Sequence, residues 1–202
     1  MAIRLRPAVF LDKDGTLIPD IPYNVDPERI SLVPGAGEAL RDLRDAGYVL
    51  CVVSNQSGAA RGYFPEPALA GVRERLQSLV ERTGAELAGC YFCPHHPEGL
   101  VPGLALACNC RKPATGLFER AARDLDIDLS RSWMVGDILD DIEAGRRAGL
   151  RTVLVDTGNE TEWRMCAERT PHFRVRSLAE AGALIAKATR ELATASLIAR
   201  AW

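Results

Sequence analysis

The sequence predicts an α/β protein with a doubly wound parallel sheet, and three observations support this fold class. Short apolar runs alternate with longer segments in which apolar residues recur every three or four positions, as expected for alternating strands and helices. The first apolar run stops at two acids, and the carboxyl ends of parallel strands are where reactive groups gather. A chain of 202 residues can build one such core, so we expect a single domain over 1–202.

The first half of the chain predicts two strands and two helices. The buried-looking run over 8–11 is the first strand. A helix over 36–46 follows, with apolar residues at helical spacing and with Gly47 at its end. The continuous apolar run over 48–53 is the second strand, and helical spacing returns over 69–80.

The second half of the chain repeats this alternation, which is the βαβ pattern of a parallel sheet. The elements that we expect there are a strand over 87–92, a helix from 115 to 125, a strand over 133–135, a helix over 138–148, strands over 152–155 and 173–175, and a helix over 178–192. The sequence contains no internal repeat and no low-complexity tract.

Two acids directly after the first strand are the most informative feature. Asp12 and Asp14 are two positions apart, and Gly15 lets the backbone turn sharply behind them. Ionised carboxylates at this spacing repel each other, so the pair implies a compensating cation or a shared proton. A polar loop after a strand would explain one of the acids but not the whole string Asp12-Lys13-Asp14-Gly15-Thr16.

This string resembles the first motif of the haloacid dehalogenase superfamily of phosphohydrolases, and three later motifs extend the resemblance over residues 8–157. The resemblance implies that Asp12 attacks phosphorus and forms an aspartyl-phosphate, and that Asp14 acts as general acid and then as general base. A binding module on this fold would lose one of the two acids, and a dehalogenase needs only the nucleophile. Transfer of the phosphoryl group to an acceptor other than water stays open.

The second motif follows the second strand directly. A hydroxyl and exposed backbone N–H groups in such a segment can bind phosphate oxygens, although the same residues alone would make an ordinary polar turn. The resemblance assigns Ser54 to catalysis and the next three residues to substrate binding, which makes the full set Ser54, Asn55, Gln56 and Ser57.

The third motif supplies cations just before a predicted helix. The resemblance implies that Lys112 neutralises the phosphoryl group and keeps Asp12 ionised, while Arg111 contacts the substrate. On its own, an Arg-Lys pair would be read as a solvated surface feature.

The fourth motif again places acids at a strand end. With Asp12 and the backbone carbonyl of Asp14, Asp137 would form a hard oxygen site suited to Mg²⁺. Such an ion screens the nucleophile from the phosphate and stabilises the transition state. We expect Asp141 to lie behind the ligands or on a metal-bound water and Asp140 to face solvent. The alternative is that these acids only interact favourably with a helix dipole.

The cysteines of the loop over 93–110 predict a second metal site. Three thiolates and one imidazole suit tetrahedral Zn²⁺, and the loop contains Gly and Pro without helical or strand periodicity. A structural metal would replace the core that this loop cannot build. The expected ligands are Cys93, His95, Cys108 and Cys110.

Alternatives to this ligand set remain. Cys108 and Cys110 could form a redox pair, or the thiols could simply be buried. Cys90 is a spare thiolate. Chemistry does not separate His95 from His96, and only the resemblance favours His95.

With a cysteine-rich loop directly before the Arg-Lys pair, the chain resembles the branch of the superfamily that contains D-glycero-D-manno-heptose 1,7-bisphosphate 7-phosphatases. Histidinol-phosphate phosphatases are close relatives of that branch. The resemblance implies hydrolysis of a small phosphorylated sugar or related monoester. Asp20 and Tyr23 match substrate-loop positions of that branch, whereas Ile138 stands where a Lys is common. The segment over 158–163 matches neither group and could line the site. About 20 residues follow Gly15 before the first helix, too few for a helical cap domain.

Composition excludes several other classes of function. A net charge of −2 argues against nucleic acid or an anionic membrane as a partner. No apolar run approaches the roughly 18 residues of a membrane span, and we recognise no signal peptide. Six cysteines without an export signal favour free thiols or metal ligands in a cytoplasmic protein. We expect a monomer whose partner is the small-molecule substrate.

Overall fold

The computed structural model describes residues 5–199 of the protein. Its six strands form one sheet in which every pair is parallel, in the order β3-β2-β1-β4-β5-β6. The strands are β1 Ala8–Leu11, β2 Val49–Asn55, β3 Leu87–Cys93, β4 Trp133–Gly136, β5 Arg151–Val155 and β6 Phe173–Val175. This is the strand order of a doubly wound fold, as the sequence predicts.

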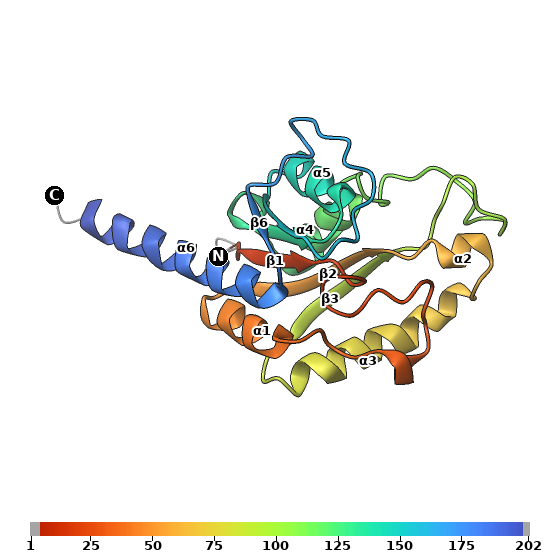
Figure 1. Cartoon of the computed structure of the whole chain (residues 1–202), viewed down its shortest axis with the longest axis horizontal. Helices are drawn as coiled ribbons and strands as arrows, with labels where there is room; N and C mark the ends of the chain where they lie inside the picture. The colour runs from red at the N-terminus through yellow and green to blue at the C-terminus, as the bar shows by residue number, and fades with distance from the viewer. Residues whose placement is uncertain (1–4, 200–202) are drawn as a thin grey trace.

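Helices cover both faces of the sheet (Figure 1). The α-helices are α1 Ala36–Asp45, α2 Gly58–Arg61, α3 Leu69–Glu81, α4 Gly116–Leu125, α5 Leu139–Arg147 and α6 Leu178–Ala199. Three short 3-10 turns also occur, η1 Pro27–Arg29, η2 Glu66–Ala68 and η3 Leu129–Arg131. In Figure 1, α1, α3 and α6 lie on one side of the sheet and α4 and α5 on the other, and α6 extends past the sheet.

The central strand shows why both faces are covered. Its four residues are all apolar and fully buried, and successive side chains point to opposite faces. Val9 and Leu11 belong to the core under α1, α3 and α6, whereas Ala8 and Phe10 belong to the core under α4. Continuous apolar strands of this kind are typical of parallel sheets with helices on both sides.

The sheet positions the candidate site at its carboxyl edge. β1 lies between β2 and β4. The strand order changes direction at β1, because β2 and β3 lie on one side of it and β4, β5 and β6 on the other. A crevice opens at such a topological switch point, and ligands of open α/β sheets bind there. Asp12 follows β1 and Asp137 follows β4, so the two acids meet at this position.

The expected strands and helices are present, and most of their ends shift by a few residues, but α6 continues to Ala199, well beyond the expected end at residue 192. β2 runs to Asn55, so Ser54 lies inside the strand rather than after it. The four-residue helix α2 is absent from the prediction because it is too short to show a period. Between β1 and α1 the only helical structure is η1, which agrees with the expected absence of a helical cap domain. Within the described residues, no helix combines the length and apolar character needed to cross a membrane.

Candidate active site

A buried lysine ties together two acids at the carboxyl edge of the sheet. Lys112 is only 2 % exposed, and its Nζ lies 2.6 Å from Oδ1 of Asp12 and 2.5 Å from Oδ1 of Asp141. The same ammonium donates a 2.9 Å hydrogen bond to the carbonyl oxygen of Val53 in β2. These three acceptors match the three donors of an ammonium group. The contacts therefore hold a charged lysine against Asp12.

A third carboxylate, that of Asp137, lies close to the two acids that contact this ammonium. Oxygens of Asp12, Asp137 and Asp141 lie within 4.8 Å of one another, and all three residues are buried. Burial, together with the charge of Asp12, raises the pKa of Asp137 to about 7. Burial also raises the pKa of Asp141, and Lys112 opposes the shift. The raised pKa values show that the ionised forms of these acids are destabilised by burial and by one another, so a further cation beside Lys112 would stabilise them.

Burial lowers the pKa of Lys112, but the carboxylates of Asp12 and Asp141 outweigh it, so the net pKa is raised. The lysine thus stays protonated throughout the physiological range.

The backbone of the lysine is also held in place. Asn55, the last residue of β2, donates through Nδ2 to the carbonyl oxygen of Lys112 at 3.0 Å. The backbone N–H of Lys112 in turn donates to Oδ1 of Asn55 at 3.0 Å. This two-way pairing connects the loop before α4 to the sheet, so the Asn55 side chain is engaged with the protein.

A second acid lies beside this cluster and has its own partners. Asp14 lies 2.8 Å from Nζ of Lys13, and its other oxygen accepts a 3.0 Å hydrogen bond from Nε2 of Gln56. Gln56 Nε2 also donates to Oγ of Ser54 at 3.0 Å. Burial raises the pKa of Asp14, although Lys13 opposes this shift. The raised pKa favours the protonated form that a general acid requires.

The acids open into a cavity of about 330 Å³. The sequence-predicted residues that line it are Asp12, Asp14, Asp20, Tyr23, Ser54, Asn55, Gln56, Ser57, Lys112 and Asp137. Asn159 also lines it, which confirms for this residue the expectation that the segment over 158–163 borders the site. Pro22, Asn24 and Phe64 line it as well. Arg111 is not among the lining residues, so its contact with a substrate stays a prediction.

Tyr23 lines the cavity and has an exposed side chain. Tyr23 has a φ of 55°, a left-handed conformation that is uncommon for an aromatic residue. Its ring centroid lies 4.4 Å from that of Tyr63, and both side chains are exposed. Such a strained, exposed residue at a cavity mouth is a frequent feature of ligand-binding sites.

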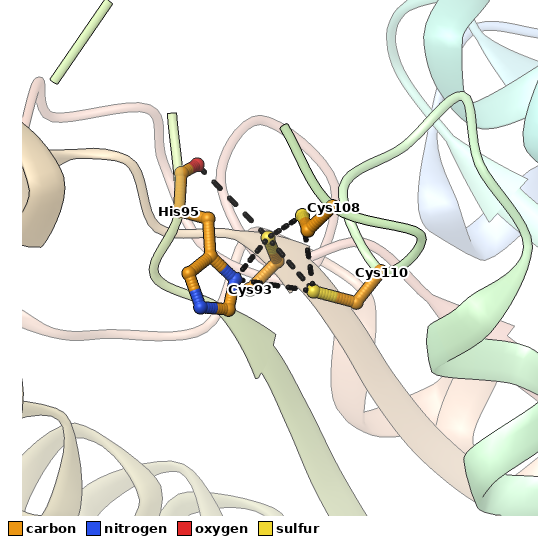
Figure 2. A group of neighbouring side chains, drawn as sticks. All are labelled: Cys93, His95, Cys108 and Cys110. Carbon is orange, nitrogen blue, oxygen red and sulfur yellow. Dashed lines mark hydrogen bonds between the residues drawn. The ribbon is translucent and has the colours of Figure 1, made fainter. Parts of the chain in front are cut away.

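The loop between β3 and α4 brings together the four predicted zinc ligands (Figure 2). The sulfur of Cys110 lies 3.3 Å from the sulfurs of both Cys93 and Cys108, and those two sulfurs are 3.6 Å apart. Nδ1 of His95 lies 3.3 Å from the Cys110 sulfur. Separations of this size fit four ligands at the roughly 2.0–2.3 Å zinc bond lengths of a tetrahedral site. They are far beyond the roughly 2.05 Å of a disulfide bond.

The neighbouring histidine has a different partner. Nε2 of His96 lies 3.0 Å from Nη2 of Arg61, outside the sulfur cluster. Burial, together with the nearby charges of Arg111 and Arg61, lowers the pKa of His96. Cys90 lies within β3 and is also outside the cluster. The geometry thus favours His95 as a ligand.

Two acids of the fourth motif each have a cation as partner. Asp141 is fully buried and contacts Lys112 directly, and its expected position behind the ligands or on a metal-bound water stays a prediction. Asp140 does not simply face solvent, because its carboxylate pairs with Arg169 at 3.0 Å. The spacing of the acids gave no sign of either partner, since both cations come from distant loops.

The chain is similar to known phosphatases. A sequence model described as HAD-hydrolase-like matches residues 109–181, which include Lys112 and Asp137. The D-glycero-beta-D-manno-heptose-1,7-bisphosphate 7-phosphatase of Haemophilus ducreyi is 48 % identical over 153 residues, 75 % of this chain and 84 % of the relative. The enzyme named D-glycero-D-manno-heptose-1,7-bisphosphate 7-phosphatase in Thermosynechococcus vestitus is 46 % identical over 157 residues, 76 % of this chain and 80 % of the relative.

Two solved structures are similar over most of the chain. A HAD-like phosphatase from Mesorhizobium loti is 37 % identical with a TM-score of 0.78, covering 91 % of this chain and 87 % of its own. The D,D-heptose 1,7-bisphosphate phosphatase of B. bronchiseptica, solved with magnesium and phosphate, is 28 % identical with a TM-score of 0.72. That match covers 90 % of this chain and 98 % of the other.

Proposed function

The chain belongs to the HAD-like hydrolases and is a phosphatase, and from this premise we propose that it removes the 7-phosphate of D-glycero-D-manno-heptose 1,7-bisphosphate. The observation that carries the proposal is the buried cluster of Asp12, Lys112 and Asp137, with Asp14 beside it, in a cavity of about 330 Å³. Relatives that share this much of the sequence are named for that reaction.

Asp12 is the proposed nucleophile. One of its carboxylate oxygens attacks phosphorus, the bond from phosphorus to the sugar oxygen breaks, and an aspartyl-phosphate remains. Lys112, 2.6 Å from Oδ1 of Asp12, keeps that carboxylate in position and offsets the charge of the incoming phosphate. Attack by water on phosphorus then releases inorganic phosphate and restores Asp12.

Asp14 is the proposed proton donor and acceptor. In the first step it gives its proton to the departing sugar oxygen, and in the second it takes a proton from the attacking water. Its raised pKa, caused chiefly by burial, supports the first role. Gln56 Nε2 binds the Asp14 carboxylate at 3.0 Å and so orients it. Ser54, which accepts from the same amide, is placed to bind a phosphate oxygen.

The residues present fit a magnesium ion. Three buried carboxylates against one buried ammonium leave an excess of negative charge, and carboxylate oxygens are the ligands that Mg²⁺ prefers. Asp12 and Asp137, with the backbone carbonyl of Asp14, would hold the ion, while Asp141 binds Lys112. When bound, Mg²⁺ supplies charge neutralisation between nucleophile and phosphate.

Zinc is the proposed occupant of the sulfur cluster. Cys93, His95, Cys108 and Cys110 supply four soft ligands and leave no protein position for a reactive water, which supports a structural role. The cluster lies just before Lys112 in the chain, so a folded loop delivers that lysine to the acids.

The substrate is tested by steady-state release of phosphate with Mg²⁺ on a panel of substrates. The panel contains both anomers of the heptose bisphosphate, histidinol phosphate and simple sugar phosphates. We expect the highest kcat/KM for a heptose bisphosphate and release of the 7-phosphate, which ³¹P NMR of the product identifies. A higher kcat/KM for histidinol phosphate than for either heptose bisphosphate would show that the proposed substrate is wrong and that histidinol phosphate is the better one. Histidinol phosphate is in the panel because Ile138, an apolar residue that lines the cavity, stands where the resemblance to the heptose phosphatases implies a Lys.

A further inference from the structure

The loop that joins β5 to β6 contacts the metal-binding acids through Asn159. Its Nδ2 donates a 2.8 Å hydrogen bond to Oδ2 of Asp137, and Asn159 lines the same cavity. The other oxygen of Asp137 accepts a 3.1 Å hydrogen bond from Oγ1 of Thr16. Both oxygens of this carboxylate are therefore bound by neutral donors. Each carboxylate oxygen has two lone pairs, so both remain able to bind a cation.

Gly15 makes room for this contact. A Cβ atom at that position would lie 2.1 Å from Oδ2 of Asp137 and 2.4 Å from Nδ2 of Asn159. Its φ of 79° is also in the left-handed region that favours glycine. Only a residue without a Cβ atom leaves space at position 15, directly after Asp14, for the hydrogen bond between Asn159 and Asp137.

Glu160 attaches the same loop to α5. One of its carboxylate oxygens accepts a 2.6 Å hydrogen bond from the backbone N–H of Leu139, the first residue of α5. The other accepts from the backbone N–H of Glu162 at 2.6 Å. N–H groups in the first turn of a helix have no partner within the helix, and an acid there is favourable. The anchor point lies two residues after Asp137, so it holds Asn159 close to its target.

We propose that Asn159 and Glu160 form a positioning element of the metal site, in which Asn159 orients the Asp137 carboxylate and Glu160 holds Asn159 against α5. The inference rests on the proposed function for the assignment of Asp137 as a magnesium ligand. An amide suits this task because it donates to the carboxylate without a positive charge that would compete with the ion. Partners of this kind commonly change metal affinity by 10–100-fold when they are removed.

The test is a direct measurement of Mg²⁺ binding by calorimetry, on protein freed of Mg²⁺ with its zinc retained. In Asn159→Ala we expect the dissociation constant for Mg²⁺ to rise about tenfold. Glu160→Ala should raise it by a smaller factor, because Asp137 itself is untouched. Thr161→Ala is the matched control, since Thr161 is exposed in the same loop, and its constant should not change. In Asn159→Ala, excess Mg²⁺ should restore most of the rate of phosphate release.

Two further measurements separate the possible outcomes. An unchanged Mg²⁺ constant in Asn159→Ala would overturn the proposal. So would a loss that excess Mg²⁺ cannot restore, accompanied by a lower unfolding temperature without Mg²⁺, because it would show a purely structural role. Asp137→Asn tests the premise. If that variant binds Mg²⁺ as well as the natural protein does, the metal assignment itself is wrong and the proposal is overturned with it.

Discussion

The two clusters of metal-ligand side chains in this protein are built in opposite ways. The acid cluster combines Asp12 after β1, Asp137 after β4 and Asp141 in α5, so the sheet and one helix place its members. The sulfur cluster takes Cys93 from the end of β3 and its other members from the irregular loop over 94–115. The acids lie in or directly after regular elements, whereas three of the four sulfur-cluster residues lie in an irregular loop, although Cys93 itself belongs to the core under α4.

This difference indicates what an ion would do at each cluster. Because packed strands place the acids, an ion at that site changes the chemistry more than the fold. An ion at the sulfur cluster changes the fold of the loop itself. The two are nevertheless connected in one direction, since the loop carries Lys112 into the acid cluster. Loss of the sulfur site should therefore damage catalysis, whereas loss of an acid should leave the sulfur site intact.

The largest expected effect separates activity from fold. Asp12→Asn should abolish phosphate release and the trapped acyl-phosphate, because a neutral amide cannot attack phosphorus. The isosteric change should leave the zinc content and the unfolding temperature close to those of the natural protein. Steady-state kinetics and elemental analysis measure these quantities. A residual rate above about one per cent of the natural rate would contradict the covalent mechanism.

The sulfur cluster should respond in the opposite manner. Cys108→Ser should lower zinc content and unfolding temperature together, since zinc contributes roughly 10 kcal/mol or more to folding in isolated zinc-finger peptides. Activity should fall because Lys112 is misplaced, while Mg²⁺ should still bind at Asp12 and Asp137. Cys166→Ser is the matched control, because Cys166 is exposed and lies outside the cluster.

Two results would contradict this account of the two sites. Absence of zinc from a preparation made without chelator would contradict the zinc assignment. A collapse of Mg²⁺ affinity in Cys108→Ser would show that the acid cluster is not preformed by the sheet.

A third prediction tests the acid cluster through pH. Burial raises the pKa of Asp137 from its usual 3.8 to about 7, so without Mg²⁺ the folded state binds its proton more tightly than the unfolded state does. The contribution of this group to the unfolding free energy should therefore fall between about pH 4 and pH 7, by no more than about 1.4 kcal/mol per pH unit. Stabilisation by Mg²⁺, which replaces that proton, should grow over the same interval.

Denaturant unfolding at several pH values measures this slope. The comparison is the difference between the natural protein and Asp137→Asn, because burial also lowers the pKa of His96 and of His172, and these groups contribute to the pH dependence of both proteins. Equal slopes in the two proteins would mean that Asp137 is ionised without the metal.

The sequence predicted the parts of the site that lie in short, ordered motifs. Asp12 and Asp137 could be placed together because each follows an apolar strand, and parallel strands end at one edge. The sulfur ligands could be grouped because thiol and imidazole groups are rare and closely spaced. The fold class could be predicted because strands and helices differ in the spacing of their apolar residues, and the two kinds of segment alternate along the chain.

The remaining contacts depend on tertiary structure that no local pattern encodes. Asp141 binds a lysine from a distant loop, and Asn55 pairs with the backbone of that same lysine rather than standing free. Asn159 reaches the acids from a loop without regular structure. Only the folded chain brings these partners within hydrogen-bond distance.

The smallest expected effect concerns Ile138, which lies between Asp137 and the first residue of α5. Its side chain lines the cavity, so Ile138→Lys would place an ammonium near a second phosphate of the substrate. An exposed pair of opposite charges is worth at most about 1 kcal/mol, which corresponds to a several-fold fall in KM for the heptose bisphosphate. Ile138→Met is the control, because it lengthens the side chain without charge. The effect should shrink with added salt and should be absent for a simple aryl monophosphate. If Ile138→Lys instead lowers kcat/KM for the bisphosphate while Ile138→Met does not, the cavity is built for an apolar substrate body at this position, and histidinol phosphate becomes the better substrate.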